Sequence, residues 1–266
     1  MKMIKNTWAA LKFGIFVLWS VAQIPVLVIL WPFPRRLRII QFHICSWVIA
    51  KIFGLRFRIN GKISKHRPLL LVANHISIFE LLAFPALFRC GFFAKGEVRE
   101  WPVLGWMTGM FGNFFIERNP MCAIDAIKTI RSQMLAANVP YAIFPEGTTT
   151  NGNYILPFKS ALFESFNGTV AKIQPITILY RDKHGNKIPP QVMADEYAYF
   201  ANSKQSQPPF AKRELSAAEL LWKTLIRGGF VVEVHILPLY DAHGQNRKQM
   251  ADTLFAQISE KFEELK

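Results

Sequence analysis

The sequence predicts an α/β fold with a mixed central sheet flanked by helices, preceded by an N-terminal membrane-associated two-helix motif. Two observations lead to this prediction. From Leu69 onward, short apolar runs of strand length alternate with segments whose apolar residues recur at helical spacing, which is typical of α/β layer structures. Before that point the chain is apolar and basic. We therefore assign residues 1–60 to a membrane-associated helical anchor and residues 61–266 to one folded domain.

The anchor contains a stretch of 22 uncharged residues, Phe13 to Pro34, which is long enough to cross a bilayer core. Pro25 interrupts this stretch, and a second apolar stretch runs from Ile39 to Leu55. We expect two helices joined at Trp31–Pro34. Because basic residues lie on both sides of the first stretch, charge gives no crossing direction, and a hairpin within one leaflet fits better than a single span. No small-residue cleavage site follows, which argues against a signal peptide.

The positive charge of the chain is concentrated at its N-terminus. The formal net charge is +14, from 32 basic and 18 acidic residues. Twelve of the basic residues precede Glu80, the first acidic residue. A basic end beside apolar sequence favours an anionic membrane surface over nucleic acid as the partner. Cys45, Cys90 and Cys122 form neither a disulfide framework nor a zinc motif, which indicates a reduced, cytosol-facing protein.

Apolar runs and helical spacing give the expected order of elements in the folded domain. The strand candidates are Leu69–Ala73, Gly91–Ala94, Asn113–Ile116, Tyr141–Phe144, Ile173–Leu179 and Phe230–Leu237. Apolar residues between 124 and 134 predict a helix that begins near Asn119-Pro120. A stripe from Met250 to Leu265 predicts a final helix that packs on the core. The polar, proline-bearing segment 181–212 is expected to run over the surface.

Asn74 and His75 directly follow a predicted buried strand, and Glu80 lies five residues after His75. On one helix this spacing would separate the two side chains by about 140°. We therefore place His75 in the turn before a helix, from where its ring folds back toward Glu80. A carboxylate there fixes the imidazole tautomer and leaves one nitrogen free to take a proton from an alcohol. The alternative is a capping box formed by Ser77 and Glu80, in which Glu80 only caps the helix start.

A second motif ends in an arginine, in the segment Gly112-Asn113-Phe114-Phe115-Ile116-Glu117-Arg118. The pattern predicts a strand followed by Arg118, whose guanidinium suits the phosphate or carboxylate of an anionic head group. The alternative is an ordinary surface arginine paired with Glu117 or Asp125.

A third motif joins an apolar strand to a carboxylate and a turn, in the segment Tyr141-Ala142-Ile143-Phe144-Pro145-Glu146-Gly147-Thr148. Gly147 frees the backbone for a turn, and the amides and hydroxyls of such a turn suit an anion. Lys159 lies close enough in sequence to add a cation. The alternative is a capped turn without a ligand, because Gly and Thr are common turn residues.

Together these motifs resemble the glycerolipid acyltransferases of the 1-acylglycerol-3-phosphate (lysophosphatidic acid) acyltransferase type, within the lysophospholipid acyltransferase superfamily. The resemblance covers roughly residues 68–180 and rests on four blocks that stand in the order typical of that family. The blocks are His75 to Glu80, Gly112 to Arg118, Phe144-Pro145-Glu146-Gly147-Thr148, and Ile173-Gln174-Pro175-Ile176. Four blocks in order are far more specific than any one of them.

The resemblance implies transfer of an acyl chain from acyl-CoA or acyl carrier protein to the free hydroxyl of a lysolipid, first of all 1-acylglycerol-3-phosphate. His75 would be the general base and Glu80 would orient its ring. Substrate binding would fall to Arg118, Glu146, Gly147, Thr148 and Lys159. No metal or redox cofactor is expected, because no His, Cys and carboxylate cluster has ligand spacing. The implied location is the inner (cytoplasmic) membrane of a bacterium, with the catalytic domain on the cytoplasmic side.

The chain departs from the family pattern at two positions. Glu80 stands where the family usually has Asp, and Thr149 stands where an Arg normally follows Gly-Thr. The second departure puts lysophosphatidic acid in question unless Lys159 or Arg118 compensates. The sequence around Thr149 resembles the lyso-ornithine-lipid acyltransferases as much, whose acceptor lacks a phosphomonoester. Two rival classes are a non-enzymatic peripheral membrane protein and a thioesterase-like hydrolase that uses the same His-carboxylate pair.

Overall fold

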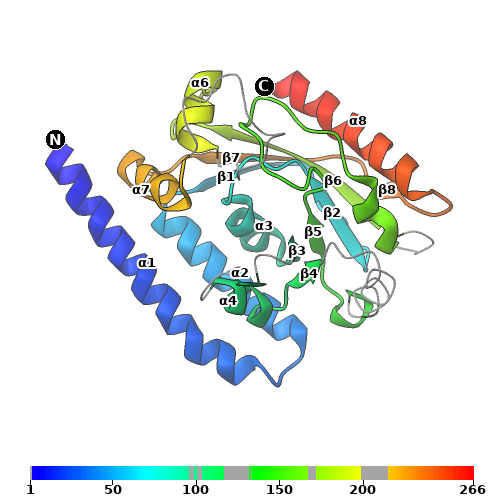
Figure 1. The fold of residues 1–266 in the computed structure, drawn as a ribbon, viewed down its shortest axis with the longest axis horizontal. Coiled ribbons are helices and arrows are strands. Elements are labelled where there is room, and N and C mark those ends of the chain that lie inside the picture. The colour runs from blue at the N-terminus through cyan, green and yellow to red at the C-terminus, as the bar shows by residue number, and fades with distance from the viewer. Residues whose placement is uncertain are drawn as a thin grey trace.

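A mixed sheet lies between two layers of helices in the computed structural model (Figure 1). The structure describes residues 2–95, 99–100, 104–116, 132, 134–166, 172–198 and 215–266. Within these ranges the strands are β1 (Arg56–Asn60), β2 (Leu69–Ala73), β3 (Gly91–Lys95), β4 (Phe114–Ile116), β5 (Tyr141–Ile143), β6 (Lys172–Arg181), β7 (Val231–Ile236) and β8 (Tyr240–Asp241). The predicted α/β class with a mixed central sheet is confirmed.

Five neighbouring strands of the sheet run parallel. The order is β1-β7-β6-β2-β5-β3-β4, with β8 beside β6. All pairs from β6 to β4 are parallel, whereas β7 is antiparallel to β6 and pairs in parallel with β1. The carboxyl ends of β6, β2, β5, β3 and β4 therefore lie at one edge of the sheet, which is where ligands bind in open α/β sheets.

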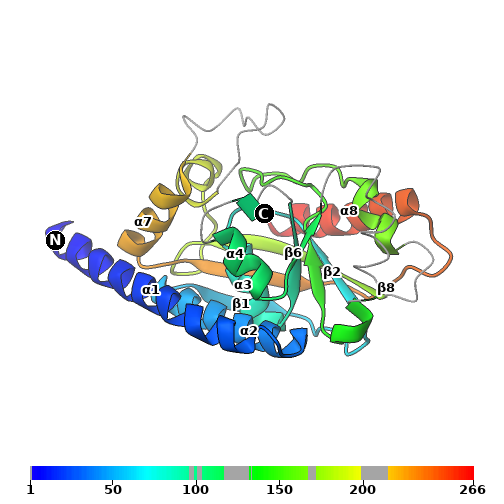
Figure 2. The ribbon, with the colours of Figure 1, turned by 60° about the horizontal axis from the view of Figure 1, so that its bottom comes forward.

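Helices cover both faces of this sheet. They are α1 (Lys2–Leu30), α2 (Arg35–Ile52), α3 (Glu80–Phe88), α4 (Leu104–Met110), α6 (Pro190–Val192), α7 (Ala217–Arg227) and α8 (Arg247–Leu265), with a 3₁₀ helix η3 (Ser160–Phe166) and a π-helical turn η4 (Met193–Tyr197). The terminal helix α8 lies on the opposite side of the sheet from α1 and α2 (Figure 1, Figure 2). Its residues Met250, Leu254, Ile258 and Phe262 are buried as the stripe predicted, whereas Leu265 at the end of the stripe is partly exposed.

Strand β2 shows how the core is divided between the two faces. All five of its residues are buried. Leu69 and Leu71 belong to the apolar cluster that includes α2 and α3, whereas Leu70 and Val72 belong to the cluster that includes α8. Side chains alternate across a strand, so a central strand with helices on both sides needs an unbroken apolar run. This is why the strand before His75 was recognisable from sequence.

The two N-terminal helices meet at the predicted joint. Helix α1 ends at Leu30 and α2 begins at Arg35, and the two helices pack side by side (Figure 2). From Ile4 to Leu30, α1 is long and apolar enough to cross a membrane, judged by length and composition alone. Much of its outward face is apolar, including the exposed side chains of Trp8, Leu18 and Ile29. The two-helix motif is thus present, with an apolar surface that faces away from the sheet.

The structure adds elements that the sequence pattern did not predict. Strand β1 lies within the range assigned to the anchor, yet it pairs with β7 along its whole length. Its charged residues Arg56 and Arg58 and its largely exposed surface explain why it does not read as an apolar run. In segment 181–212, Met193 and Tyr197 of η4 are buried, so this part is not a surface excursion, because it contributes to the core. Residues 199–214 and most of the helix expected at 124–134 lie outside the described residues.

Candidate active site

Three segments of the chain meet at the carboxyl edge of the parallel strands. His75 follows β2, Glu146 follows β5, and Tyr180 is the penultimate residue of β6. Because β2 lies between β6 and β5 and is parallel to both, residues just beyond the ends of these strands become neighbours. The site is therefore built by sheet topology from parts that are far apart in sequence.

Asn74 fixes the chain at the point where β2 ends. Its Nδ2 donates to the carbonyl oxygen of Ile178 at 3.0 Å, and its Oδ1 accepts from the backbone N–H of the same residue at 2.7 Å. The two hydrogen bonds continue the pairing of β2 with β6, with a side chain in place of backbone. The backbone is then free to turn, and His75 leaves the sheet from a fixed point.

His75 and Glu80 form the predicted pair. His75 Nδ1 lies 2.8 Å from Glu80 Oε2, and the two side chains are 17% and 0% exposed. Helix α3 begins at Glu80, so His75 lies in the turn before the helix, as its spacing required. The ring of Phe144 stacks on the imidazole, with ring centroids 4.3 Å apart. Because Glu80 accepts the proton on Nδ1, the neutral ring presents Nε2 as the base, and no described residue bonds Nε2.

Glu80 also stabilises the start of α3, although without a complete capping box. Its Oε2 accepts from the backbone N–H groups of Ser77 at 2.8 Å and Ile76 at 3.2 Å. Among the described residues, the reciprocal bond of a capping box, from the backbone N–H of Glu80 to Ser77 Oγ, is missing. The carboxylate therefore combines the two roles that the sequence left as alternatives, since it caps the turn and holds the histidine.

The carboxylate of Glu146 joins two loops. Its Oε1 accepts from the backbone N–H of His75 and its Oε2 from the backbone N–H of Leu156, both at 2.7 Å. The carboxyl is buried, and burial raises its pKa to about 8, helped by the nearby Glu80 charge and opposed by the two backbone hydrogen bonds. Glu146 thus fixes the backbone of His75. Its role as a substrate-binding residue stays a prediction.

The turn after Glu146 has the conformation that its glycine allows. Gly147 has φ +68°, and a Cβ atom there would lie 2.7 Å from Lys159 Nζ. The exposed Lys159 therefore extends over the turn, and its backbone N–H donates to the carbonyl oxygen of Pro145. Thr148 and Thr149 are buried, and their hydroxyls have no hydrogen-bond partner among the described residues. The structure brings Gly147, Thr148 and Lys159 together beside Glu146, whereas Arg118 lies outside the described residues.

Sequence reasoning missed three contacts of this site. The hydroxyl of Tyr180 donates to Glu80 Oε1. The backbone N–H of Leu156 bonds Glu146, and Phe144 covers one face of the His75 ring. Phe144 stands in the recognised third block, but a stacking role is not visible from its position. Tyr180 lies 100 residues from its partner, and no local pattern marks such a pairing.

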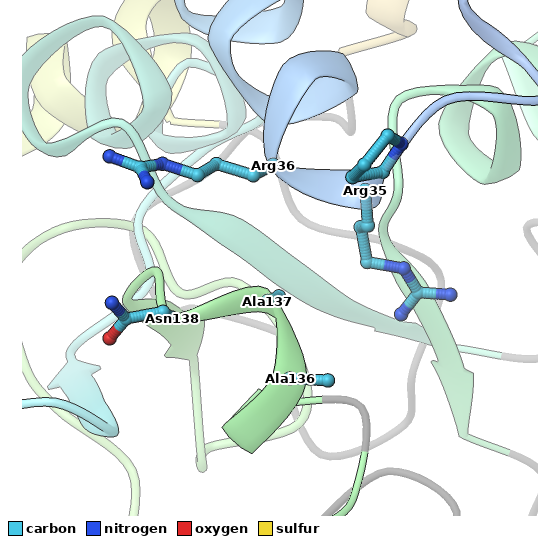
Figure 3. Close-up of a pocket in the computed structure, with 6 residues that line it drawn as sticks. Arg35, Arg36, Ala136, Ala137 and Asn138 are labelled. Atoms are coloured by element: carbon cyan, nitrogen blue, oxygen red, sulfur yellow. The ribbon is translucent and has the colours of Figure 1, made fainter.

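A separate cavity lies where α2 begins (Figure 3). It has a volume of about 380 Å³ and is lined by Pro34, Arg35, Arg36, Ala136, Ala137 and Asn138. The side chains of Arg35 and Arg36 leave the helix start in different directions (Figure 3). Among the described residues, none of the predicted site residues lines this cavity, which is therefore separate from the site of His75 and Glu80.

Comparison with known proteins agrees with this geometry. The family described as Acyltransferase matches residues 55–179, which span the chain from the start of β1 to β6 and include His75, Glu80 and Glu146. Residues 55–179 are an acyltransferase domain. The resemblance inferred from the four sequence blocks is confirmed for this region, and relatives of the region carry the names of lysolipid acyltransferases.

Relatives of this acyltransferase domain carry two different names. A lyso-ornithine lipid O-acyltransferase of Brucella abortus is 35% identical over 146 residues, 52% of this chain and 54% of that protein. A 1-acyl-sn-glycerol-3-phosphate acyltransferase of Neisseria gonorrhoeae is 36% identical over 118 residues, 44% of this chain and 46% of that protein. The chain thus spans about half the length of the curated relatives it matches.

The fold of the whole chain has a solved counterpart. The crystal structure of the 1-acyl-sn-glycerophosphate acyltransferase PlsC of Thermotoga maritima superposes with a TM-score of 0.68 at 18% identity, covering 100% of this chain and 98% of that one. At this identity the likeness concerns the fold, which includes the N-terminal helices as well as the acyltransferase domain.

Proposed function

We propose that this protein transfers an acyl chain from acyl-CoA or acyl carrier protein to the free hydroxyl of a lysolipid, with His75 as the general base. The observation that carries the proposal is the 2.8 Å contact between His75 Nδ1 and Glu80 Oε2, at the edge of the sheet where the parallel strands end. The imidazole is partly exposed and its partner is fully buried. A ring held in this way has one tautomer and one orientation, as a general base requires.

The proposed reaction proceeds by direct attack. His75 Nε2 takes the proton of the acceptor hydroxyl while the oxygen attacks the thioester carbonyl carbon. The carbon–sulfur bond then breaks, and the imidazolium returns the proton to the departing thiolate. The buried Glu80 carboxylate stabilises the imidazolium between these two steps. No side chain is acylated. In the described part of the chain, Cys90 is fully buried, and burial raises the pKa of its thiol, which disfavours it as a nucleophile.

The first candidate acceptor is 1-acylglycerol-3-phosphate. Its phosphate would bind Arg118, which stands two residues after the end of β4 in the sequence. Lys159 supports the same proposal, because its ammonium lies over the Gly147 turn that follows Glu146. Gly147 and Thr148 would shape this side of the pocket.

A lyso-ornithine lipid is the second candidate acceptor. Thr149 stands where the acyltransferases that form phosphatidic acid, which this sequence resembles, usually have arginine. Threonine is uncharged, and Thr149 is buried, so this position supplies no cation for a phosphate. Several relatives of the domain are named lyso-ornithine lipid O-acyltransferases. An acceptor without a phosphomonoester is compatible with this loss of charge.

Association with an anionic membrane, on the cytoplasmic face of a bacterial inner membrane, completes the proposal. The exposed apolar side chains of α1 and the arginines at the start of α2 support it. A lipid acceptor and its product both reside in a bilayer, so an enzyme that lies on the membrane avoids extracting either one.

Product analysis tests the proposal. Purified full-length protein in lipid vesicles receives a labelled acyl-CoA or acyl carrier protein together with a panel of lysolipids, and mass spectrometry identifies the acylated product. His75→Ala should lower the transfer rate by roughly 100-fold to 10,000-fold, the usual contribution of general-base catalysis. His243→Ala is the matched control, because His243 is exposed in the turn before α8. Its rate should stay unchanged.

Three outcomes would contradict the proposal. A His75→Ala variant with a near-normal transfer rate excludes His75 as the base. Release of free fatty acid in place of acylated lipid indicates a hydrolase. Vesicle binding without any consumption of thioester indicates a non-enzymatic membrane protein.

A further inference from the structure

Glu80 is held at both of its carboxylate oxygens, and each oxygen has its own partners. Oε2 faces His75 Nδ1 and the backbone amides of Ile76 and Ser77. Oε1 accepts from the hydroxyl of Tyr180. The bond to Tyr180 comes from another strand of the sheet, so it fixes the carboxylate relative to β6 and not only relative to its own helix.

Tyr180 is placed rigidly enough to act on Glu80. It lies two residues beyond Ile178, whose backbone bonds Asn74, so the strand that carries Tyr180 also fixes the residue before His75. The side chain of Tyr180 is buried, and its ring packs on Phe230 at 4.6 Å between ring centroids. Burial and the nearby charge of Glu80 raise the pKa of Tyr180 well above its usual value. The phenol therefore keeps its proton and remains a donor at any pH at which the enzyme works.

We propose that Tyr180 is a positioning residue of the catalytic pair, which holds the carboxylate of Glu80 and sets how much of its negative charge acts on His75. The inference rests on the proposed function and deepens it. A hydrogen bond to one carboxylate oxygen withdraws charge from the other, so Tyr180 moderates the basicity that Glu80 confers on the imidazole. Two contacts of Glu80 thus connect Tyr180 on β6 to the His75 ring in the turn after β2.

The length of the Glu80 side chain is part of this arrangement. The carboxylate reaches His75 on one side and Tyr180 on the other. An aspartate at this position is shorter by one carbon–carbon bond, about 1.5 Å, so it can keep one of these partners but not both. Glu80 and Tyr180 thus act as a matched pair in this chain.

Removal of the Tyr180 hydroxyl has a predictable sign. Without this donor, more negative charge remains on the oxygen that faces His75, so the charged imidazolium is stabilised and the pKa of His75 rises. The acid limb of the profile of kcat/KM against pH, which reports the neutral base, should move to higher pH. Glu146, whose pKa is raised to about 8 by burial, is the other titrating group that contacts the histidine among the described residues, and it is the same in both variants.

The test compares Tyr180→Phe with a matched control. Tyr141→Phe also removes a buried hydroxyl, one that donates to the carbonyl oxygen of Gly112 and lies outside the His75–Glu80 pair. Full-length protein in detergent micelles is titrated by NMR, with the His75 imidazole signal assigned from the spectrum of His75→Ala. For Tyr180→Phe we expect the pKa of His75 to rise by about 0.5 to 1 unit, the acid limb of kcat/KM to rise with it, and kcat to fall roughly 10-fold. Tyr141→Phe should change neither the pKa of His75 nor the acid limb of kcat/KM.

Thermal unfolding of both variants measures the structural cost of losing a buried hydroxyl. Equal loss of stability in the two variants, without any shift of the His75 titration in Tyr180→Phe, would overturn the inference. A downward shift of the His75 pKa would overturn it as well.

A double-mutant cycle provides the second readout. If Glu80→Asp already breaks the contact with Tyr180, then Tyr180→Phe should move the acid limb less in the Glu80→Asp background than in the wild type. If the shifts of the acid limb caused by Glu80→Asp and Tyr180→Phe simply add in the double variant, the inference that Glu80 and Tyr180 act as a pair is contradicted. The NMR titration needs no turnover, so a wild type without acyl transfer would end the proposed function alone. Acyl transfer with an unshifted Tyr180→Phe variant would end this inference alone.

Discussion

Glu146 shows at the scale of one residue how a carboxylate can hold the backbone of a site. Both of its oxygens accept backbone hydrogen bonds, one from the N–H of His75 and one from the N–H of Leu156. Its buried carboxyl has a pKa of about 8, above the ordinary value of 4.5. The folded protein therefore holds a proton on Glu146 more tightly than the unfolded chain does.

The raised pKa predicts a dependence of stability on pH. The stabilisation is complete below about pH 4.5 and is lost as the pH rises through about 8. Glu146→Gln, which cannot titrate, should lack this decline, which amounts to a few kcal/mol at most. It should also be less stable at low pH, because its amide nitrogen cannot accept one of the two backbone hydrogen bonds. Thermal unfolding from pH 5 to 9 checks this, and parallel profiles for the two proteins would contradict it.

A second prediction at this scale concerns the acceptor. Arg118→Ala should raise the KM for a phosphate-bearing lysolipid by roughly 10-fold or more while the KM for the acyl donor stays within about twofold, because a lost charged hydrogen bond costs about 1.5 to 3 kcal/mol. Lys159→Met tests in the same way the cation that lies over the Gly147 turn. Steady-state kinetics with each substrate varied in turn gives both constants. Equal changes for acceptor and donor would count against a role in head-group binding.

Single residues of the site were predictable only where local sequence marks them. His75 and Glu80 stand five residues apart behind an apolar strand, and the contact between them follows from that spacing. The roles of Tyr180 and Leu156 depend on which strands become neighbours and on where loops return. Side-chain roles also stayed ambiguous, since Glu80 combines helix capping with orientation of the histidine.

At the scale of elements, two glycines let the anchor and the sheet meet closely. A Cβ atom on Gly229, just before β7, would lie 2.0 Å from the carbonyl oxygen of Gly54, which stands between α2 and β1. Gly229 also has φ +94°. No side chain fits at this crossing, and the crossing allows β1 to pair with β7 along its length.

Substitution at this crossing should be strongly destabilising. Gly229→Ala adds a backbone clash to the cost of a positive φ, so it should lower the free energy of unfolding by more than about 4 kcal/mol. Gly228→Ala is the control, because Gly228 has φ +83° with no atom near its missing Cβ, and should cost only about 1 to 2 kcal/mol. Chemical denaturation measures both. A similar loss in the two variants would show that conformation alone, and not the close approach, sets the cost.

Elements followed from the sequence where burial makes the pattern simple. β2, flanked by helices on both faces, appears as an unbroken apolar run, and α8 as a stripe at helical spacing. The edge strand β1 alternates arginines with apolar residues and is mostly exposed, so its sequence lacks the apolar run that identified the other strands. The two-residue strand β8 is too short to leave any pattern.

On the scale of the whole molecule, an apolar surface on α1 accompanies the acyltransferase domain. The side chains of Leu18 and Ile29 are 72% and 67% exposed, while α2 and α7 cover the other side of the helix. Exposed apolar patches of this kind mark contact with a membrane or a partner. Because the proposed acceptor is a lipid, we favour a membrane over a protein partner as the contact of this surface.

Replacing these side chains should detach the protein from lipid. Leu18→Ser with Ile29→Ser should lower binding to anionic vesicles by roughly 100-fold or more, because about 1.5 to 3 kcal/mol of apolar burial is lost for each side chain. Leu239→Ser, an exposed apolar residue between β7 and β8, is the control. Flotation with vesicles of anionic and of neutral lipid measures the binding. Unchanged flotation of the double variant would exclude α1 as the membrane contact.

The parallel order of β6, β2, β5, β3 and β4 has an evolutionary consequence. His75 and Glu80, the proposed base and its partner, are fixed by β2, α3 and β6, whereas the candidates for head-group binding come from segments after β4 and β5 in the sequence. Acceptor preference can then diverge by exchange of those segments while the proton-transfer chemistry stays intact. In a chimaera, residues 117–131 or 147–153 of this protein would be replaced by those of a relative with a different acceptor. The chimaera should take the acceptor preference of that relative and keep the turnover rate of this protein.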